Sequence, residues 1–369
     1  MEFGWTAAQE ERFARMRALG AEVDAASPDD RLARLAAGGA LGLAIASDHG
    51  GSGLDLLTTA GAFEALGTTC ADGGVLLAAG AHLFGAALTV QRVGTPEHRA
   101  AWLPRLASGE VLATVAATEE ASGSDIAAAL ATATPRPGGG FSVEGCKRYV
   151  TSADRAGLFL VFARQPAPAS GLVALLVPAG PRVVAGPPWA TAGLRGARLA
   201  PIELRGVEVG AEAVLGRAGA GMAVFQIAMA FERALVLAFR LGAMQRQLDA
   251  AVAFARQREV GGVPIARHQA VAHRVARMKL RLETARLVLY RAAWVLDRGQ
   301  RGQAEAALAK WHVASEALES ALDAAHLRGG AGYLADGEEP GAIHDALGGT
   351  IHSGTADVLA TIVARWLGV

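Results

Sequence analysis

The strongest constraint on the fold is the spacing of apolar residues, which changes from a helical period to a strand period and back along the chain. From Ala7 to about Val111 the sequence is rich in Ala and Leu with helix-forming charges, broken by turn residues such as 49–53. Between Val111 and Gly216, short β-type runs separated by Pro and Gly replace this pattern. After Gly219 the helical period returns in longer pieces. This order predicts an α+β chain rather than βαβ alternation.

Three parts follow from these changes: an N-terminal helical domain at residues 1–112, a middle antiparallel β domain at 113–216 and a C-terminal four-helix bundle at 217–369. The glycine-rich turn at 135–140 favours antiparallel pairing, because glycine supplies the positive φ angles of hairpin turns. The strands are expected at Phe141–Val143, Leu158–Ala163, Leu172–Val177 and Ile202–Val209. The later helices are expected at Met222–Arg258, His268–Arg298, Gln303–Leu327 and Val358–Leu367.

Composition narrows the class of protein. The 35 Lys and Arg balance 35 Asp and Glu without long runs of one sign, so we expect neither nucleic acid nor an anionic membrane as a partner. The N-terminus lacks an Arg-rich or apolar targeting segment, and no uninterrupted apolar stretch reaches the roughly 18 residues of a spanning helix. This predicts a cytoplasmic protein. Cys70 and Cys146 are too few for a disulfide framework or a cysteine metal site, and we expect no metal.

Nine short stretches, taken together and in order, resemble one family. No strand is followed by a G-x-G-x-x-G turn that opens a helix, so a Rossmann domain is not expected. The chain instead resembles the acyl-CoA dehydrogenase family of flavoproteins, which implies the three-part α+β fold above with FAD held between the parts. The stretches are His49–Asp55, Ala117–Asp125, Cys146–Ala153, Gly193–Leu199, Phe231–Val236, Ala255–Ala270, Ala306–Ala317, Leu327–Tyr333 and His352–Thr355.

The resemblance implies two groups of FAD-binding residues. Thr118 and Thr151 match positions near the isoalloxazine ring, where hydroxyls provide hydrogen-bond partners, and Ser124, in the same stretch as Thr118, is also expected to bind the cofactor. Tyr149 matches an aromatic position that shields one face of the flavin, although Thr and Tyr are also favoured in ordinary strands. The second group reaches FAD partly from a neighbouring subunit, which implies a homodimer or homotetramer. It consists of Arg258, Gln269, Gly329, Gly330 and Thr355.

The catalytic base is the least conventional feature of this resemblance. Most family members have Glu before the Gly-Thr pair of the last loop, where this chain has Ser353. A subset that includes isovaleryl-CoA dehydrogenase carries the acid instead on the first long helix of the bundle, immediately before an Arg, and this chain has Glu232 and Arg233 there. We therefore predict Glu232 as the base and Arg233 as substrate-binding, with His352 as a reserve base.

Helix geometry gives separate support for Glu232, because residues three, four and seven apart share a face. A carboxylate alone on an apolar stripe is desolvated, which raises its pKa toward the range of a general base. The alternative is that Glu232 pairs with a buried Arg and serves only packing. The residues of its stripe are all apolar: Phe225, Ala228, Met229, Leu235, Val236 and Phe239.

The expected activity is FAD-dependent α,β-dehydrogenation of an acyl thioester, carried on CoA or on an acyl carrier protein. The family often has Asp two residues before the helix acid, and Ala230 at this position hints at a biosynthetic, carrier-bound substrate. An electron-transfer flavoprotein or oxygen would accept the electrons. Two alternatives stay open: a flavin monooxygenase of the same fold, and a catalytically silent subunit, which the departures from the family pattern at Gly261 and His326 motivate.

Overall fold

Helices form the first part of the chain, as the helical period predicts. The computed structural model describes residues 4–166 and 171–369. The first helix begins after Thr6, whose hydroxyl accepts from the backbone N–H of Gln9 while the Gln9 side chain accepts from the N–H of Thr6. The helices of this part are α1 (Ala7–Ala25), α2 (Arg31–Ala37), α3 (Leu56–Thr69), α4 (Gly73–Gly80), α5 (Leu88–Val93) and α6 (Pro96–Ser108), with the π-helical segment η3 (Ala81–Ala87) joining α4 to α5.

The predicted strands lie in one seven-stranded sheet, ordered β1-β4-β2-β3-β7-β6 with β5 beside β4. The glycine-rich turn closes the hairpin of β2 and β3, which pair antiparallel as expected, with Pro135 opposite Phe141. Most pairs are antiparallel, but β4 runs parallel to both β1 and β2, so the sheet is mixed and not purely antiparallel as predicted. The strands are β1 (Ala113–Ala116), β2 (Thr132–Pro135), β3 (Phe141–Val150), β4 (Leu158–Arg164), β5 (Leu172–Pro178), β6 (Val183–Ala185) and β7 (Ala200–Val209).

The β4 strand shows how the sheet joins the helices. Successive side chains of a strand point to opposite faces. Phe159 and Val161 belong to the core within the curled sheet, whereas Leu160 and Phe162 belong to the larger core shared with both helical parts. Both faces of β4 are therefore buried, which explains its continuous apolar run.

The C-terminal helices follow the predicted ranges, with one break. The segment expected at Met222–Arg258 is divided between Leu235 and Ala238. The break lets the first piece pack on η3 and β5 while the second packs on α3 and α9. The structure also adds a helix that the sequence analysis missed, α11. The helices are α7 (Gly221–Leu235), α8 (Ala238–Gln257), α9 (Gln269–Asp297), α10 (Gln303–Arg328), α11 (Glu338–Gly349) and α12 (Ala356–Leu367).

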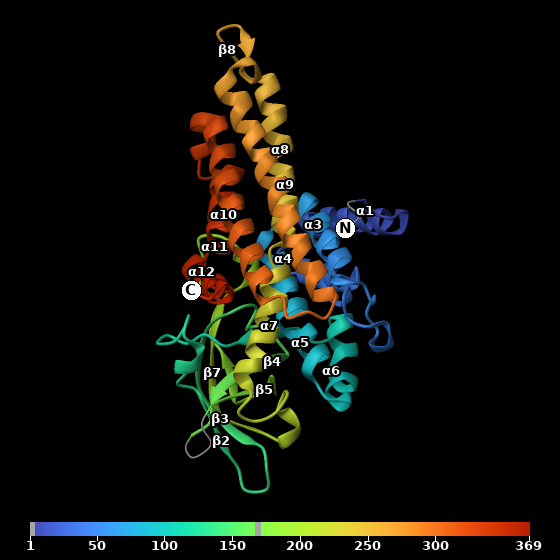
Figure 1. Ribbon diagram of the computed structural model, residues 1–369, viewed down its shortest axis with the longest axis vertical. Coiled ribbons are helices and arrows are strands. Elements are labelled where there is room, and N and C mark those ends of the chain that lie inside the picture. Colours follow the sequence, from blue (N-terminus) through green and yellow to red (C-terminus); the bar gives the residue numbers. More distant parts are fainter. Residues whose placement is uncertain (1–3, 167–170) are drawn as a thin grey trace.

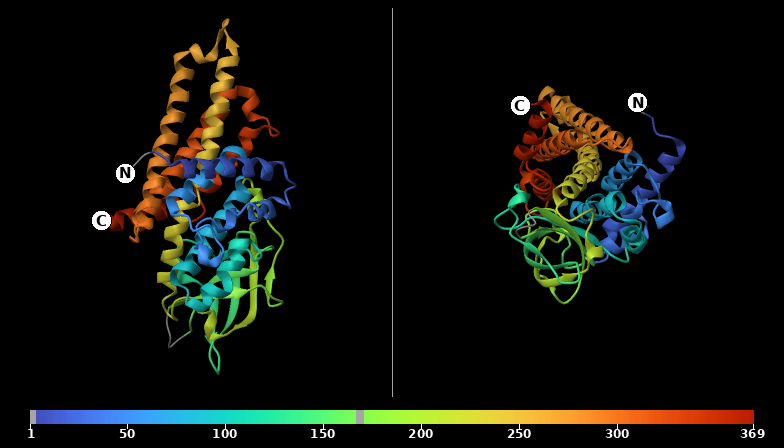
Figure 2. Two further views of the ribbon diagram at one scale, coloured as in Figure 1. Left: turned by 90° about the vertical axis from the view of Figure 1, so that its right-hand side faces the viewer. Right: turned by 60° about the horizontal axis from the view of Figure 1, so that its bottom comes forward.

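The molecule is long, with the sheet at one end and the paired helices α8 and α9 projecting at the other (Figure 1). The small hairpin of β8 (Glu259–Val260) and β9 (Val263–Pro264) closes this projection. Of the N-terminal helices, α5 and α6 lie beside the sheet, while α3 packs on α8 and α9 (Figure 1). Helix α1 packs on α3 and crosses the middle of the molecule in the left view of Figure 2.

Among the residues that the structure describes, two helical stretches are long and apolar enough to cross a membrane by length and composition alone, although glycines or charges interrupt both. In Gly73–Val93 all of the apolar window is buried inside the protein, and in Gly221–Gln257 56% of it is. Packing in the core accounts for the first stretch, and the second is broken between α7 and α8.

Candidate active site

Glu232 lies in the last turn of α7, between the N-terminal helices and the bundle. Its stripe neighbours Ala228, Met229 and Leu235 are buried, while Glu232 itself is half-buried. The apolar surroundings raise the pKa of the Glu232 carboxyl, and this rise is opposed by a hydrogen bond from Ser353 and by nearby positive charges. The shift agrees in direction with the one expected from the helix pattern, and it suits a general base.

The last loop brings Ser353 and His352 directly to this carboxylate. The Ser353 hydroxyl donates a hydrogen bond to Oε1 of Glu232, and His352 Nδ1 lies 3.1 Å from Ser353 Oγ. Ser353 has a φ of 55°, in the left-handed region that a serine adopts only at a cost. The residues that the sequence offered as separate candidates therefore form one chain of hydrogen bonds.

Two cationic side chains, the half-buried Arg233 and the buried Lys310, hold the backbone of this loop. Arg233 donates from Nε to the carbonyl of Ser353 at 2.9 Å, and Lys310 donates from Nζ to the carbonyl of Gly354 at 2.7 Å. Burial lowers the pKa of Arg233, and burial with the charge of Arg233 lowers the pKa of Lys310 to about 7. Arg233 is thus committed to the loop, so a contact with substrate remains only a prediction.

The other side of the carboxylate faces the π-helical segment. A Cβ atom added to Gly85 would lie 2.6 Å from Oε2 of Glu232 and 3.1 Å from Val115. No side chain fits at this position without displacing its neighbours, so Gly85 makes the space in which the carboxylate lies. π-Helical turns of this kind often occur at functional sites.

Lys310 gives a prediction on stability. Its pKa lies near 7 in the folded protein and near the ordinary value of 10.5 in the unfolded chain. Between these values the unfolded state binds more protons, so stability rises with pH by up to roughly 1.4 kcal/mol per pH unit. Urea unfolding across this window should show that wild type gains this stability relative to Lys310→Met. The exposed Lys279 is the control, and an equal slope for Lys310→Met and Lys279→Met would contradict the assignment.

The first group of predicted FAD residues lies together at one end of the sheet. The backbone N–H of Arg148 donates to the carbonyl of Thr118 at 2.8 Å, which ties that segment to the end of β3 where Tyr149 and Thr151 lie. Tyr149 is 58% exposed, has a φ of 57° and packs on Trp189 at 5.1 Å between ring centroids. Ser124 is exposed, and the adjacent Gly123 lies against Thr118. An exposed ring held at a strained position fits a planar cofactor.

The second group is divided between two places. Arg258 and Gln269 are exposed and flank the β8–β9 hairpin, at the opposite end of the molecule from the sheet (Figure 1). Gly329 and Gly330 follow α10, whose last residue Arg328 lies over the ring of Phe254, one turn before Arg258. Thr355 lies elsewhere, in the loop beside Glu232, as the N-cap of α12 without a hydrogen bond from its side chain to the helix. Within one chain, the structure does not bring Arg258 and Gln269 to Tyr149.

Comparison with known proteins decides the family. Models of the acyl-CoA dehydrogenase N-terminal, middle and C-terminal domains match residues 8–110, 114–207 and 219–368. The chain belongs to the acyl-CoA dehydrogenase family. As a member of it, the protein is an FAD-dependent oxidoreductase that dehydrogenates an acyl thioester at a CH–CH bond. The fold and the family inferred from the nine stretches are thereby confirmed.

Relatives within this acyl-CoA dehydrogenase family include proteins that act on carrier-bound groups. The L-prolyl-[peptidyl-carrier protein] dehydrogenase of Pseudomonas fluorescens is 39% identical over 334 residues, covering 89% of this chain and 87% of the relative. The crystal structure of the prolyl acyl carrier protein oxidase AnaB superposes with a TM-score of 0.94 at 30% identity, covering 99% of this chain and 100% of AnaB. The structure of PigA with FAD and proline superposes with a TM-score of 0.94 at 30% identity, covering 100% of this chain and 99% of PigA.

Sequence reasoning missed two residues of this acyl-CoA dehydrogenase site. Lys310 carried a sequence signal, since it is a single charge within an Ala-rich helical stretch. In the structure its side chain is only 1% exposed. Gly85 carried none, because its contact with Glu232 depends on tertiary packing between η3 and α7.

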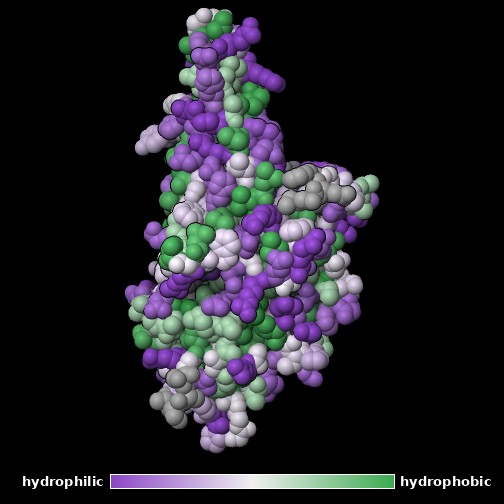
Figure 3. Space-filling model, viewed as in Figure 1, coloured by the Kyte–Doolittle hydropathy of each residue, from purple (hydrophilic) through white to green (hydrophobic). Residues whose placement is uncertain are grey.

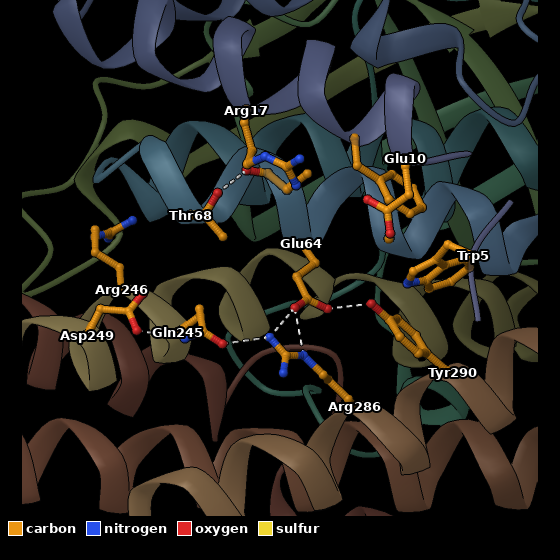
Figure 4. A pocket seen from close by; sticks show the side chains of 13 residues that line it. Trp5, Glu10, Arg17, Glu64, Thr68, Gln245, Arg246, Asp249, Arg286 and Tyr290 are labelled. Atoms are coloured by element: carbon orange, nitrogen blue, oxygen red, sulfur yellow. Dashed lines mark hydrogen bonds and ion pairs between the residues drawn. The ribbon is translucent and has the colours of Figure 1, made fainter. Parts of the chain in front are cut away.

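A separate cavity of about 480 Å³ lies away from Glu232, lined by residues of α1, α3, α8 and α9 (Figure 4). Its buried carboxylate, Glu64, accepts hydrogen bonds from Arg286 at 2.7 Å and from the hydroxyl of Tyr290. The charges of Glu64 and Arg286 are therefore paired with each other, and none of the predicted site residues lines the cavity.

Proposed function

We propose that this flavoprotein oxidises an L-prolyl group held as a thioester on a carrier protein, with Glu232 as the base that removes the Cα proton. The observation that carries the proposal is the half-buried Glu232 carboxylate with a raised pKa, placed where the last loop has lost its own acid. The prolyl dehydrogenases from Pseudomonas and Serratia and the oxidase AnaB support the substrate class. Ala230, in place of an Asp, also favours a substrate other than an ordinary acyl-CoA.

The thioester carbonyl acidifies the Cα proton, so a carboxylate of raised pKa can take it at neutral pH. The transition state resembles an enolate and needs hydrogen-bond donors at the carbonyl oxygen. When bound, FAD supplies the acceptor for the hydride of Cβ. Five residues would hold the flavin half of FAD: Thr118, Ser124, Tyr149, Thr151 and Thr355. Four others would reach FAD from a second copy of the chain: Arg258, Gln269, Gly329 and Gly330.

We also propose that the protein forms a homo-oligomer, either a homodimer or a homotetramer. Arg258 and Gln269 project beyond the body of the chain on the paired helices. Exposed apolar side chains lie on the same projection, including Val260 at 55% and Leu280 at 62% exposed, and green and purple residues are interspersed there in Figure 3. We also place the enzyme in the cytoplasm, with an electron-transfer flavoprotein or oxygen as the electron acceptor.

The test is anaerobic bleaching of the bound flavin by a panel of thioesters: L-prolyl carrier protein, L-prolyl-CoA, butyryl-CoA and isovaleryl-CoA. We expect the L-prolyl carrier to bleach the flavin fastest. Equal or faster bleaching by butyryl-CoA or isovaleryl-CoA would contradict the substrate class. Flavin reduction by NAD(P)H instead of by any thioester would favour the monooxygenase alternative, and isolation without FAD or the ability to bind it would favour the silent subunit.

A further inference from the structure

We infer that Ser353 and His352 are positioning residues, which fix one oxygen of the Glu232 carboxylate and keep the carboxylate ionised through a chain of two hydrogen bonds. The inference rests on the proposed role of Glu232 as the base. It gives the loop a role after the loss of its own acid: the loop supports the base that lies on the helix.

The direction of each hydrogen bond follows from the chemistry of the groups. An ionised carboxylate only accepts, so the Ser353 hydroxyl must donate its proton to Oε1 of Glu232. The lone pair of Ser353 Oγ is then available to Nδ1 of His352, 3.1 Å away, which must carry the ring proton. This assigns the Nδ1–H tautomer to His352 and leaves its buried Nε2 without a partner among the residues that the structure describes.

His352 stays neutral in this chain of bonds. Burial and the positive charges of Lys310 and Arg240 lower the pKa of His352 to about 3. The ring therefore carries one proton across the working range, so it orients Ser353 and does not relay protons. A donor to Ser353 Oγ also strengthens the bond that the hydroxyl makes to the carboxylate, since hydrogen bonds in a chain polarise one another.

The backbone around Ser353 is built to present this hydroxyl. Ser353 keeps a left-handed φ of 55°, and the carbonyls of Ser353 and Gly354 are held by Arg233 and Lys310. A strained conformation of this kind persists where the surroundings fix it, often at a functional site. With Oε1 engaged by Ser353, Oε2 is the oxygen left to take the proton.

The charges that face Glu232 are few. The charges of Arg233 on α7 and Lys310 on α10 lower the pKa of Glu232 through space, while their N–H groups donate hydrogen bonds to the loop carbonyls and not to the carboxylate. From η3 and β1 the neighbours are Gly85 and Val115, which carry no charge. Among the described residues, Ser353 is the one group that hydrogen bonds to the carboxylate directly. The pH at which the base loses its proton should therefore respond to Ser353.

The experiment compares wild type with Ser353→Ala, Ser353→Gly, His352→Leu and His352→Asn, each with bound FAD. Two quantities are followed against pH: the rate of anaerobic bleaching by the L-prolyl carrier, and the infrared carbonyl band of the protonated Glu232 acid, identified by its loss in Glu232→Gln. Gly at 353 relieves the left-handed φ, whereas Ala keeps it, so the pair separates the hydroxyl from the backbone. Asn at 352 retains a donor near the place of Nδ1, whereas Leu does not.

We expect both Ser353 variants to move the acid limb of the rate and the infrared titration to higher pH by about one unit. At a fixed pH below the limb, the bleaching rate of these variants should therefore be about tenfold lower than that of wild type. His352→Leu should shift both quantities in the same direction by less, and His352→Asn should restore them. An unchanged limb and band in both Ser353 variants, with Glu232→Gln inactive, would overturn this inference alone. Full activity of Glu232→Gln would overturn the proposed function as well.

Discussion

Replacing Glu232 by Gln is expected to slow thioester-driven flavin reduction by about 10²–10⁴-fold, the usual contribution of a positioned general base. Gln has the shape of Glu and still accepts the hydrogen bond from Ser353 through its amide oxygen, but it cannot take a proton at neutral pH. The measurement is single-turnover bleaching at saturating L-prolyl carrier.

Arg233→Lys is the companion variant, because it keeps a cation beside the loop while it shortens the reach to the Ser353 carbonyl. It should lose much less activity than Glu232→Gln if Arg233 holds the loop. The FAD content of each variant must match that of wild type, so that a slow rate reports the chemistry and not cofactor loss. Equal rates for Glu232→Gln and wild type would make Glu232 structural and return His352 to consideration as the base.

The second large effect is expected for Gly85→Ala. The added methyl group would lie 2.6 Å from Oε2 of Glu232, so either the carboxylate or the π-helical segment has to shift. A displacement of about 1 Å at a reacting group can cost on the order of 10²-fold in rate. We therefore expect bleaching to slow by about 10²-fold, measured as the single-turnover rate at saturating substrate.

Gly80→Ala is the matched control, since Gly80 lies on the same continuous helix and a Cβ there meets its nearest atoms, on Phe84 and Val236, at 3.5 Å. That is ordinary van der Waals contact, so we expect a rate near that of wild type. If Gly80→Ala and Gly85→Ala slowed the reaction equally, disturbance of the helix and not the fit around Glu232 would be the cause.

Local patterns were sufficient to predict the four main strands, the long C-terminal helices and the helical character of the first part, whose separate helices were not predicted. The run at 158–163 and the glycine-rich turn before Phe141 depend on residues close in sequence, and both match the structure. The short strands β1, β2 and β6 were missed, because runs of three or four residues carry too little periodicity. The break between α7 and α8 was missed for another reason: neither Val236 nor Leu237 is a helix breaker such as Gly or Pro, and the two pieces separate to pack on different neighbours.

The candidate site, like the fold, was predictable where it depends on residues close in sequence and was missed where it depends on packing between distant segments. Glu232 was identifiable because its own helix surrounds it with apolar residues, a pattern written in consecutive turns. Its hydrogen bond to Ser353 joins residues 121 positions apart, and the support of the loop by Lys310 joins residues 44 positions apart. Contacts over such separations depend on how the helices pack, so the serine was understood from sequence only as the loss of an acid.

Proton removal by a base on α7 can be measured apart from the redox step. A prolyl thioester analogue with sulfur in place of the β-methylene has no β-hydride to transfer, so exchange of its Cα hydrogen for deuterium from D₂O reports the base alone. We predict that wild type incorporates deuterium, detected by mass spectrometry, and that Glu232→Gln with equal FAD does not exceed the uncatalysed rate. Exchange by Glu232→Gln as fast as by wild type would contradict the account.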